Sequence, residues 1–148
     1  QIKERAERDA TTHTGEIDLY FFARGLRSYY NMGYRFRDED ANLERLDFTS
    51  HAAKLRYIRR VDIGRKVLKV EMAYRYEKRD YSGVTPGIGS IEGEPRKDER
   101  HRVQIDLEYP VTKQGALQLY LAYGDYQSNF PISNFDQGIV GSRYVYRW

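Results

Sequence analysis

The chain has 148 residues, no cysteine and a formal charge of +3, with 40% hydrophobic and 32% charged residues. This length suits one domain, and the lack of cysteine excludes thiolate metal sites, disulfide frameworks and thiol catalysis. The near balance of 25 bases against 22 acids argues against a nucleic-acid binder, which needs a clustered basic face. Tyrosine is abundant, at 14 residues, and this residue favours strands and surfaces where apolar material meets water.

The chain opens with a polar segment or loop tail, residues 1–14, whose first ten residues lack an apolar alternate face. From residue 15 onward, apolar and polar residues alternate with a period of two, which predicts β-strands and no convincing helix. The predicted strands are 16–23, 26–37, 44–61, 66–78, 102–111, 116–126 and 137–148. The parity of the alternation changes at Gly25, which predicts a turn at Arg24-Gly25. It changes again within 44–61, which predicts a bulge near residues 49–52.

The connections between the predicted strands alternate in length. Tight turns are expected at Arg24-Gly25, 62–65 and 112–115, and longer polar loops at 38–43, 81–98 and 127–135. Short turns at one end and long loops at the other are typical of outer-membrane barrels, although an ordinary antiparallel meander also mixes loop lengths. The glycine-rich segment 81–98 predicts either an exposed loop or a constriction that folds into the barrel interior.

If the last strand runs towards the short turns, the residues of the apolar faces are sorted by their position along the strands. Strands that run towards the long loops then end on Tyr34 and Phe36, on Tyr74 and Tyr76, and on Tyr123. Strands that run the other way end on Phe21, on Tyr57, on Tyr109, and on Tyr146 with Trp148. Aliphatic residues lie between these two aromatic bands. A bilayer sorts side chains in this way because Tyr and Trp favour its two interfaces.

The last eight residues, GSRYVYRW, combine a glycine, two alternate hydrophobic positions and a terminal aromatic residue: Gly141, Tyr144, Tyr146 and Trp148. This ending resembles the assembly signal on the final strand of Gram-negative outer-membrane β-barrels, although Ile139 stands where that signal has a polar residue. The resemblance covers residues 15–148 and is one of class. It implies an all-β, antiparallel up-and-down transmembrane β-barrel of the porin or export-conduit type. It also implies a location in the outer membrane of a Gram-negative bacterium, with outer-membrane lipid and the barrel-assembly machinery as partners.

Seven predicted strands leave a bacterial barrel one short, because such barrels usually have an even number of strands. We therefore expect this chain to form part of a larger barrel that further strands from the same or other chains complete. An eight-stranded barrel with a poor first strand is the alternative.

The polar faces of the predicted strands would line the barrel interior. Charges there must pair with one another or face water, because dry burial of an unpaired charge costs several kcal/mol. They would either plug a narrow barrel or form a polar, arginine-rich conduit that biases which solutes pass. The residues expected to line the interior are Glu16, Asp18, Arg27, Arg35, Arg37, Arg56, Lys69, Glu71, Arg75, Glu77, Arg102, Asp106, Glu108 and Arg143.

Catalysis has little support in the sequence. Ser50 and His51 are adjacent, so their side chains point to opposite faces of a strand, and Asp98 and His101 have no identifiable partner carboxylate. We expect no enzyme, no metal site and no cofactor. The leading expectation is an outer-membrane pore or export conduit that serves transport, or a wall segment of one. The alternatives are a non-conducting structural anchor and a soluble lipocalin-like barrel that encloses a hydrophobic ligand.

Overall fold

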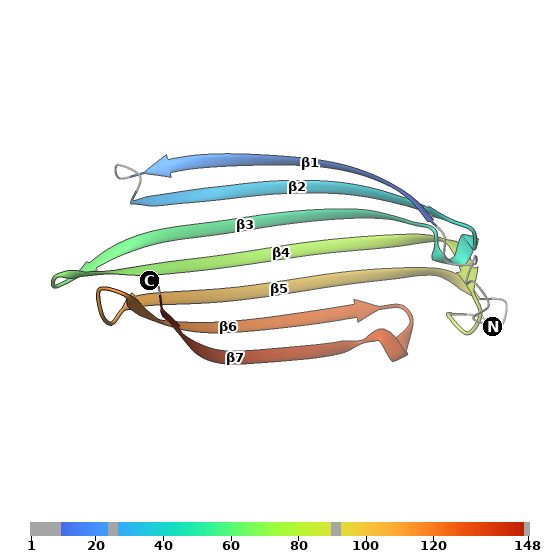
Figure 1. Cartoon of the computed structure of the whole chain (residues 1–148). Coiled ribbons are helices and arrows are strands. Elements are labelled where there is room, and N and C mark those ends of the chain that lie inside the picture. The colour runs from blue at the N-terminus through green and yellow to red at the C-terminus, as the bar shows by residue number, and fades with distance from the viewer. Residues whose placement is uncertain (1–9, 24–26, 90–92, 147–148) are drawn as a thin grey trace, which may run out of the picture.

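The computed structural model describes residues 10–23, 27–89 and 93–146, which form one antiparallel sheet of seven strands (Figure 1). Each strand pairs with the next one in sequence, so the all-β, up-and-down prediction is confirmed. The strands are β1 (Ala10–Ala23), β2 (Ser28–Ala41), β3 (Phe48–Ile63), β4 (Lys66–Thr85), β5 (Glu94–Pro110), β6 (Gly115–Ser128) and β7 (Phe135–Tyr146). The described residues also include two single 3-10 turns, η2 (Glu44–Leu46) and η3 (Pro131–Ser133). No helix within the described ranges is long and apolar enough to cross a membrane.

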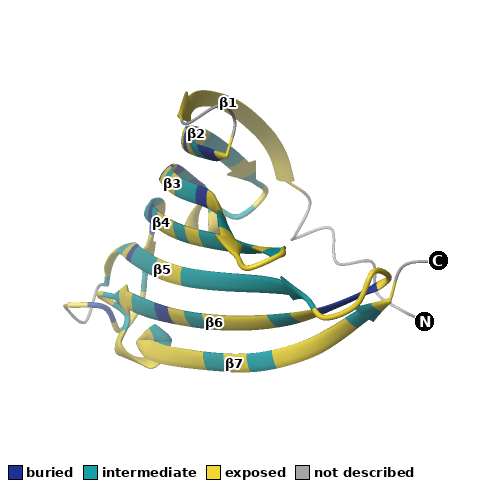
Figure 2. Cartoon of the chain, turned by 90° about the vertical axis from the view of Figure 1, so that its left-hand side faces the viewer, coloured by how far each residue is buried: buried dark blue, intermediate teal, exposed yellow. Residues whose placement is uncertain are grey.

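The sheet is curved but open. Figure 2 shows the strands arranged along an arc, with β1 at one edge and β7 at the other. Among the described residues β1 pairs only with β2, and β7 only with β6. The antiparallel sheet is therefore observed, whereas closure into a transmembrane barrel stays a prediction.

The connections at one end of the sheet are short. Gly64 and Arg65 link β3 to β4, and Gly64 has a φ of 61°, which glycine adopts without steric cost. Residues 111–114 link β5 to β6 at the same end. Ala23 pairs with Ser28, so β1 and β2 are separate strands as predicted; the predicted turn between them, Arg24-Gly25, lies outside the described residues. Residues 1–9 and the end of the chain at 147–148 lie outside them as well.

The β4–β5 hairpin is longer than the sequence predicted. Segment 81–98 was expected to be a loop, but β4 continues to Thr85 and β5 begins at Glu94, with a register shift between Asp80 and Val84. Gly83 explains why this glycine-rich stretch can remain a strand. A Cβ atom there would lie 2.3 Å from the backbone nitrogen of Arg45, so glycine lets η2 pack against β4. β1 likewise begins earlier than the predicted strand 16–23, at Ala10.

The bulge predicted near residues 49–52 is wrong. β3 pairs with β2 and with β4 in continuous register from Phe48 onward. The apparent change of parity arises because Phe48 belongs to the same face as the charged residues. Its ring lies between the guanidinium groups of Arg37 and Arg79, at 5.4 and 5.0 Å from their Cζ atoms. A phenylalanine held by two guanidinium groups needs no apolar environment, so hydrophobicity alone misplaces it.

The register gives the sheet an apolar face and a polar face. The apolar face includes Leu19, Met32 and Leu55, which are consecutive partners across β1, β2 and β3 and are 53%, 50% and 45% exposed. The polar face holds most of the buried residues, among them Asn31 and Ser50. Side chains converge on the inside of a curved sheet and spread apart on its outside. We therefore assign the polar face to the concave side and the apolar face to the convex side.

Candidate functional site

The candidate site is the polar face. The register places on it every residue that the sequence predicted for the barrel interior. These residues are Glu16 and Asp18 on β1; Arg27 before β2; Arg35 and Arg37 on β2; Arg56 on β3; Lys69, Glu71, Arg75 and Glu77 on β4; Arg102, Asp106 and Glu108 on β5; and Arg143 on β7. Their common side is a structural fact, whereas a role in transport stays a prediction.

Near the β1 edge, Lys54 joins two strands that are not neighbours. Its Nζ lies 3.1 Å from Oε1 of Glu16 and 2.9 Å from Oδ1 of Asp18, although β2 separates β3 from β1. The lysine crosses β2 over Gly33, where a Cβ atom would lie 2.4 Å from its Cε atom. Asn31 also donates to Asp18, with Nδ2 3.2 Å from Oδ1. Lys54 was missing from the predicted lining, and Gly33 opposite it is the signal that could have revealed it.

In the middle of the sheet, Glu71 binds two cations. Oε1 of Glu71 accepts from Nε of Arg56 at 2.5 Å, and Oε2 lies 3.3 Å from Nζ of Lys69. Closer to the short turns, Arg27 pairs with Asp62. These exposed and half-exposed pairs contribute little stability individually, but they fix side-chain positions on the concave face.

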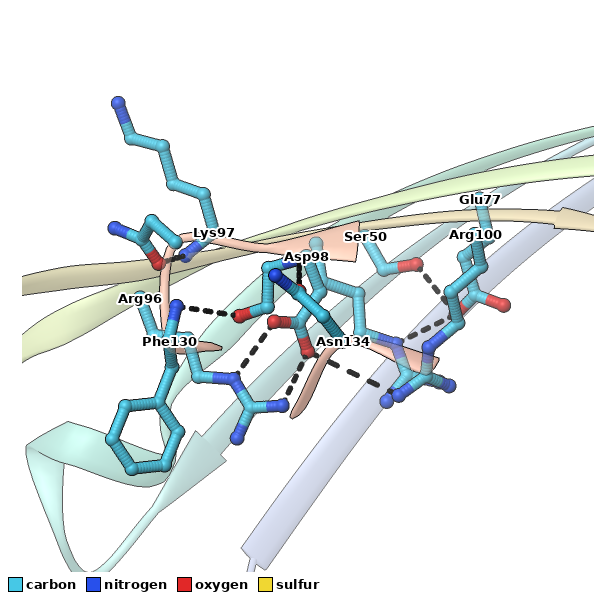
Figure 3. A network of polar contacts seen from close by, with 11 residues as sticks. Ser50, Glu77, Arg96, Lys97, Asp98, Arg100, Phe130 and Asn134 are labelled. Carbon is cyan, nitrogen blue, oxygen red and sulfur yellow. Dashed lines mark hydrogen bonds and ion pairs between the residues drawn. The ribbon is translucent and has the colours of Figure 1, made fainter. Parts of the chain in front are cut away.

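At the loop end, a denser network surrounds Glu77 (Figure 3). Its Oε1 accepts from Nε of Arg79 at 2.7 Å and from the hydroxyl of Ser50 at 3.3 Å. Its Oε2 lies 3.5 Å from the guanidinium of Arg75. Glu77 is 7% exposed, so its charge depends on these partners more than that of any carboxylate near the β1 edge does.

Asp98 is the second acid of this network. Both of its carboxylate oxygens accept from Arg96 at 2.8 Å, in a bidentate pair, and Arg100 approaches it at 4.0 Å (Figure 3). The bidentate geometry is the strong form of an arginine–carboxylate contact.

Arginines and aromatic rings alternate along the same end. The Cζ atom of Arg96 lies 5.3 Å from the ring of Tyr81 and 5.9 Å from that of Phe130, and Arg100 lies 5.6 Å from the ring of Tyr126. With Phe48 between its two guanidinium groups, these contacts run from β2 to the β6–β7 connection. Each ring attracts the cation that lies over its face, so these contacts add to the ion pairs at this end of the polar face.

The sequence missed Arg79, Arg96, Asp98 and Arg100 because the predicted strands stopped at residues 78 and 102. Arg96, Asp98 and Arg100 lie at every second position of β5, and they continue the series of polar positions that includes Arg102. The alternation itself could therefore have revealed them, had the segment not been interpreted as a loop.

Some cations of the polar face have no acidic partner. Among the described residues, Arg35 and Arg102 make no ion pair, and Arg143 donates to the side-chain oxygen of Gln118 instead of a carboxylate. The polar face therefore carries guanidinium groups that are available to solvent or to a ligand.

Comparison with protein-family models, curated proteins and solved structures finds no significant match. The residues that the structure describes include no group of three or more His, Cys, Asp and Glu side chains arranged to hold a metal ion.

The predicted assembly signal is divided between the two faces. Tyr144 and Tyr146 belong to the apolar face and are about half exposed, whereas Gly141 belongs to the polar face. The ring of Tyr120 covers Gly141, where a Cβ atom would lie 2.3 Å from it. This glycine therefore has a packing role apart from any recognition signal. Trp148 lies outside the described residues.

Proposed function

We propose that this chain is a wall segment of an outer-membrane β-barrel whose polar face lines a conduit for polar solutes. The observation that carries this proposal is the exposed apolar face on all seven strands. Soluble proteins rarely expose continuous apolar patches larger than a few hundred Å². Lipid as the solvent of this face removes the cost of exposing Leu19, Met32, Leu55 and their neighbours.

Aromatic residues near both ends of the apolar face support a bilayer as that solvent. Towards the short turns, Tyr30 and Tyr57 stack with ring centroids 4.7 Å apart. Towards the loops, the Tyr34 hydroxyl lies 2.6 Å from Nδ1 of His51, and Tyr74 and His101 repeat this contact at 2.8 Å on the next hairpin. Amphipathic rings at two levels, with aliphatic residues between them, match the interfacial girdles of transmembrane barrels.

The open edges support a larger barrel. In hydrocarbon, each unpaired N–H and C=O of β1 and β7 would cost several kcal/mol, so the sheet has to be completed there. β1 and β7 both run from the loop end to the turn end, because an odd number of antiparallel strands gives both edges the same direction. Pairing them directly, or joining two copies in the same orientation, would create a parallel contact. An odd number of further antiparallel strands completes the barrel without one.

The polar face supports a water-filled interior over a lipocalin-like cavity. A lipocalin-like binder would need its apolar face on the concave side, whereas that side here carries the ion pairs. Arg102 is exposed and Lys54 is half-exposed, which is compatible with water beside them.

Planar-bilayer recording of the full-length protein tests the proposal. Stable current steps are expected when the detergent-purified protein is added to a bilayer. A barrel that inserts and gives no steps would be a non-conducting anchor, and the conduit would be rejected. A chain that stays monodisperse in buffer without detergent would reject the membrane assignment altogether.

A further inference from the structure

We propose that Lys54, Arg75 and Arg102, here called the cationic row, together with Arg35, form a binding site for solutes that carry carboxylate or phosphate groups. Lys54 is the register partner of Arg75, and Arg75 is the register partner of Arg102. Three cations therefore lie directly opposite one another on one face of three neighbouring strands. The role of this site in transport rests on the proposed function. Binding of the ligand itself does not.

This arrangement is unfavourable for the fold. Like charges directly opposite each other across two strands destabilise a sheet. Residues whose local interactions are unfavourable for folding are expected mainly at functional sites. Glycine lies at both ends of the row, since Gly33 pairs with Lys54 and Gly124 pairs with Arg102.

The acids nearby pair with Lys54 but leave Arg75 and Arg102 largely unneutralised. Lys54 leans over Gly33 towards Glu16 and Asp18, away from Arg75. Arg75 has one carboxylate contact, Glu77 at 3.5 Å, and that acid is held more closely by Arg79 at 2.7 Å.

Arg102 is exposed and has no ion pair among the described residues. The positive charge at the centre of the polar face is thus left for a ligand.

A hollow beside the row has room for small groups. It has a volume of about 90 Å³ and is lined by Arg35, Lys54 and Arg75, with Ala52 beneath them and Glu16 at one side. Arg35 has no ion pair in the described part of the chain. Several guanidinium groups around a small residue offer planar pairs of N–H donors, which match carboxylate and phosphate oxygens. The ligand class is therefore an oxyanion with more than one charge.

Isothermal titration of the detergent-solubilised, full-length protein at low salt tests this site with two probes, citrate and tripolyphosphate. Both probes are expected to bind, and the tighter of the two identifies carboxylate or phosphate as the preferred group. The double variant R75Q/R102Q is expected to weaken binding by about tenfold or more, because two charge-assisted contacts are lost. This variant also removes a repulsion, so it is expected to fold, which circular dichroism checks.

The matched control is R59Q/K97Q, which removes the same charge from the other side of the sheet. Arg59 pairs with Val70 in register, and the Lys97 side chain points away from the charged network (Figure 3). Binding within about twofold of the unmodified protein is expected for this control, since long-range charge effects are screened. Absence of binding by the unmodified protein, or an equal loss in both double variants, would overturn the site. Binding without bilayer current would remove the conduit and leave the site in place.

Discussion

Gly33 and Lys54 are register partners, and the lysine stem occupies the space that a side chain at position 33 would need. A Cβ atom on Gly33 would lie 2.4 Å from Cε of Lys54 and 2.5 Å from Oδ1 of Asp18. One missing methyl group thus lets a cation on β3 reach acids on β1. This contact adds a side-chain link between β1 and β3 to the backbone pairing of both strands with β2.

Gly33→Ala is expected to lower the free energy of unfolding by about 1 kcal/mol, because Lys54 must leave its two carboxylates. Gly138→Ala on β7 is the matched control, since nothing lies within 4 Å of its Cβ position. Alanine there should raise stability by roughly 0.5–1 kcal/mol, because glycine weakens a strand interior. Urea unfolding in detergent measures both variants. A gain in stability at both positions would show that the contact over Gly33 is dispensable.

Two arginine substitutions, one on each face of the sheet, test whether lipid or water surrounds the apolar face. Leu121 lies near the middle of β6 on the apolar face and is 48% exposed, and Ala122 beside it lies on the polar face. In a bilayer, Leu121→Arg is expected to cost roughly 2–4 kcal/mol, the penalty for arginine at the midplane of a barrel. Ala122→Arg places the same charge on the polar face, beside the proposed conduit, and should cost much less. Reversible unfolding in lipid vesicles measures the two, and equal costs would contradict lipid contact at Leu121.

Much of this architecture is predictable from the sequence because it depends on a period of two. The strand order, the two faces and the position of every predicted interior residue follow from alternation, which local chemistry enforces residue by residue. Alternation reaches back along β5 to Arg96, but the extension of β4 past Asp80 was not predictable in the same way. Gly83 suggests a turn, and only the tertiary approach of η2 turns it into a strand position. Phe48 was misplaced because its partners, Arg37 and Arg79, come from two other strands.

The network around Glu77 should matter more for stability than the exposed pairs do. Glu77→Gln removes the charge that Arg79 and Arg75 share while keeping the size of the side chain. A loss of about 3 kcal/mol is expected, since breaking a buried pair leaves an uncompensated cation. Glu16→Gln is the control, because Glu16 is about half exposed and Asp18 remains to hold Lys54; its cost should stay below about 1 kcal/mol. Chemical unfolding of both variants decides, and similar costs would show that burial adds nothing at Glu77.

Cross-linking tests whether β1 and β7 are neighbours in the proposed barrel. The chain has no cysteine, so Leu19→Cys on β1 and Val140→Cys on β7 give a background-free pair on the apolar face. Leu119→Cys with Ser142→Cys, which are register partners on β6 and β7, is the positive control. A short bifunctional maleimide applied to outer-membrane vesicles is expected to join the control pair and leave the first pair unlinked, because further strands separate β1 from β7. A link within one chain would instead indicate closure with seven strands, and a link between two chains would indicate a head-to-tail dimer. In both results β1 would lie beside β7 in a parallel contact. Either result would therefore reject the proposal that an odd number of further antiparallel strands completes the barrel.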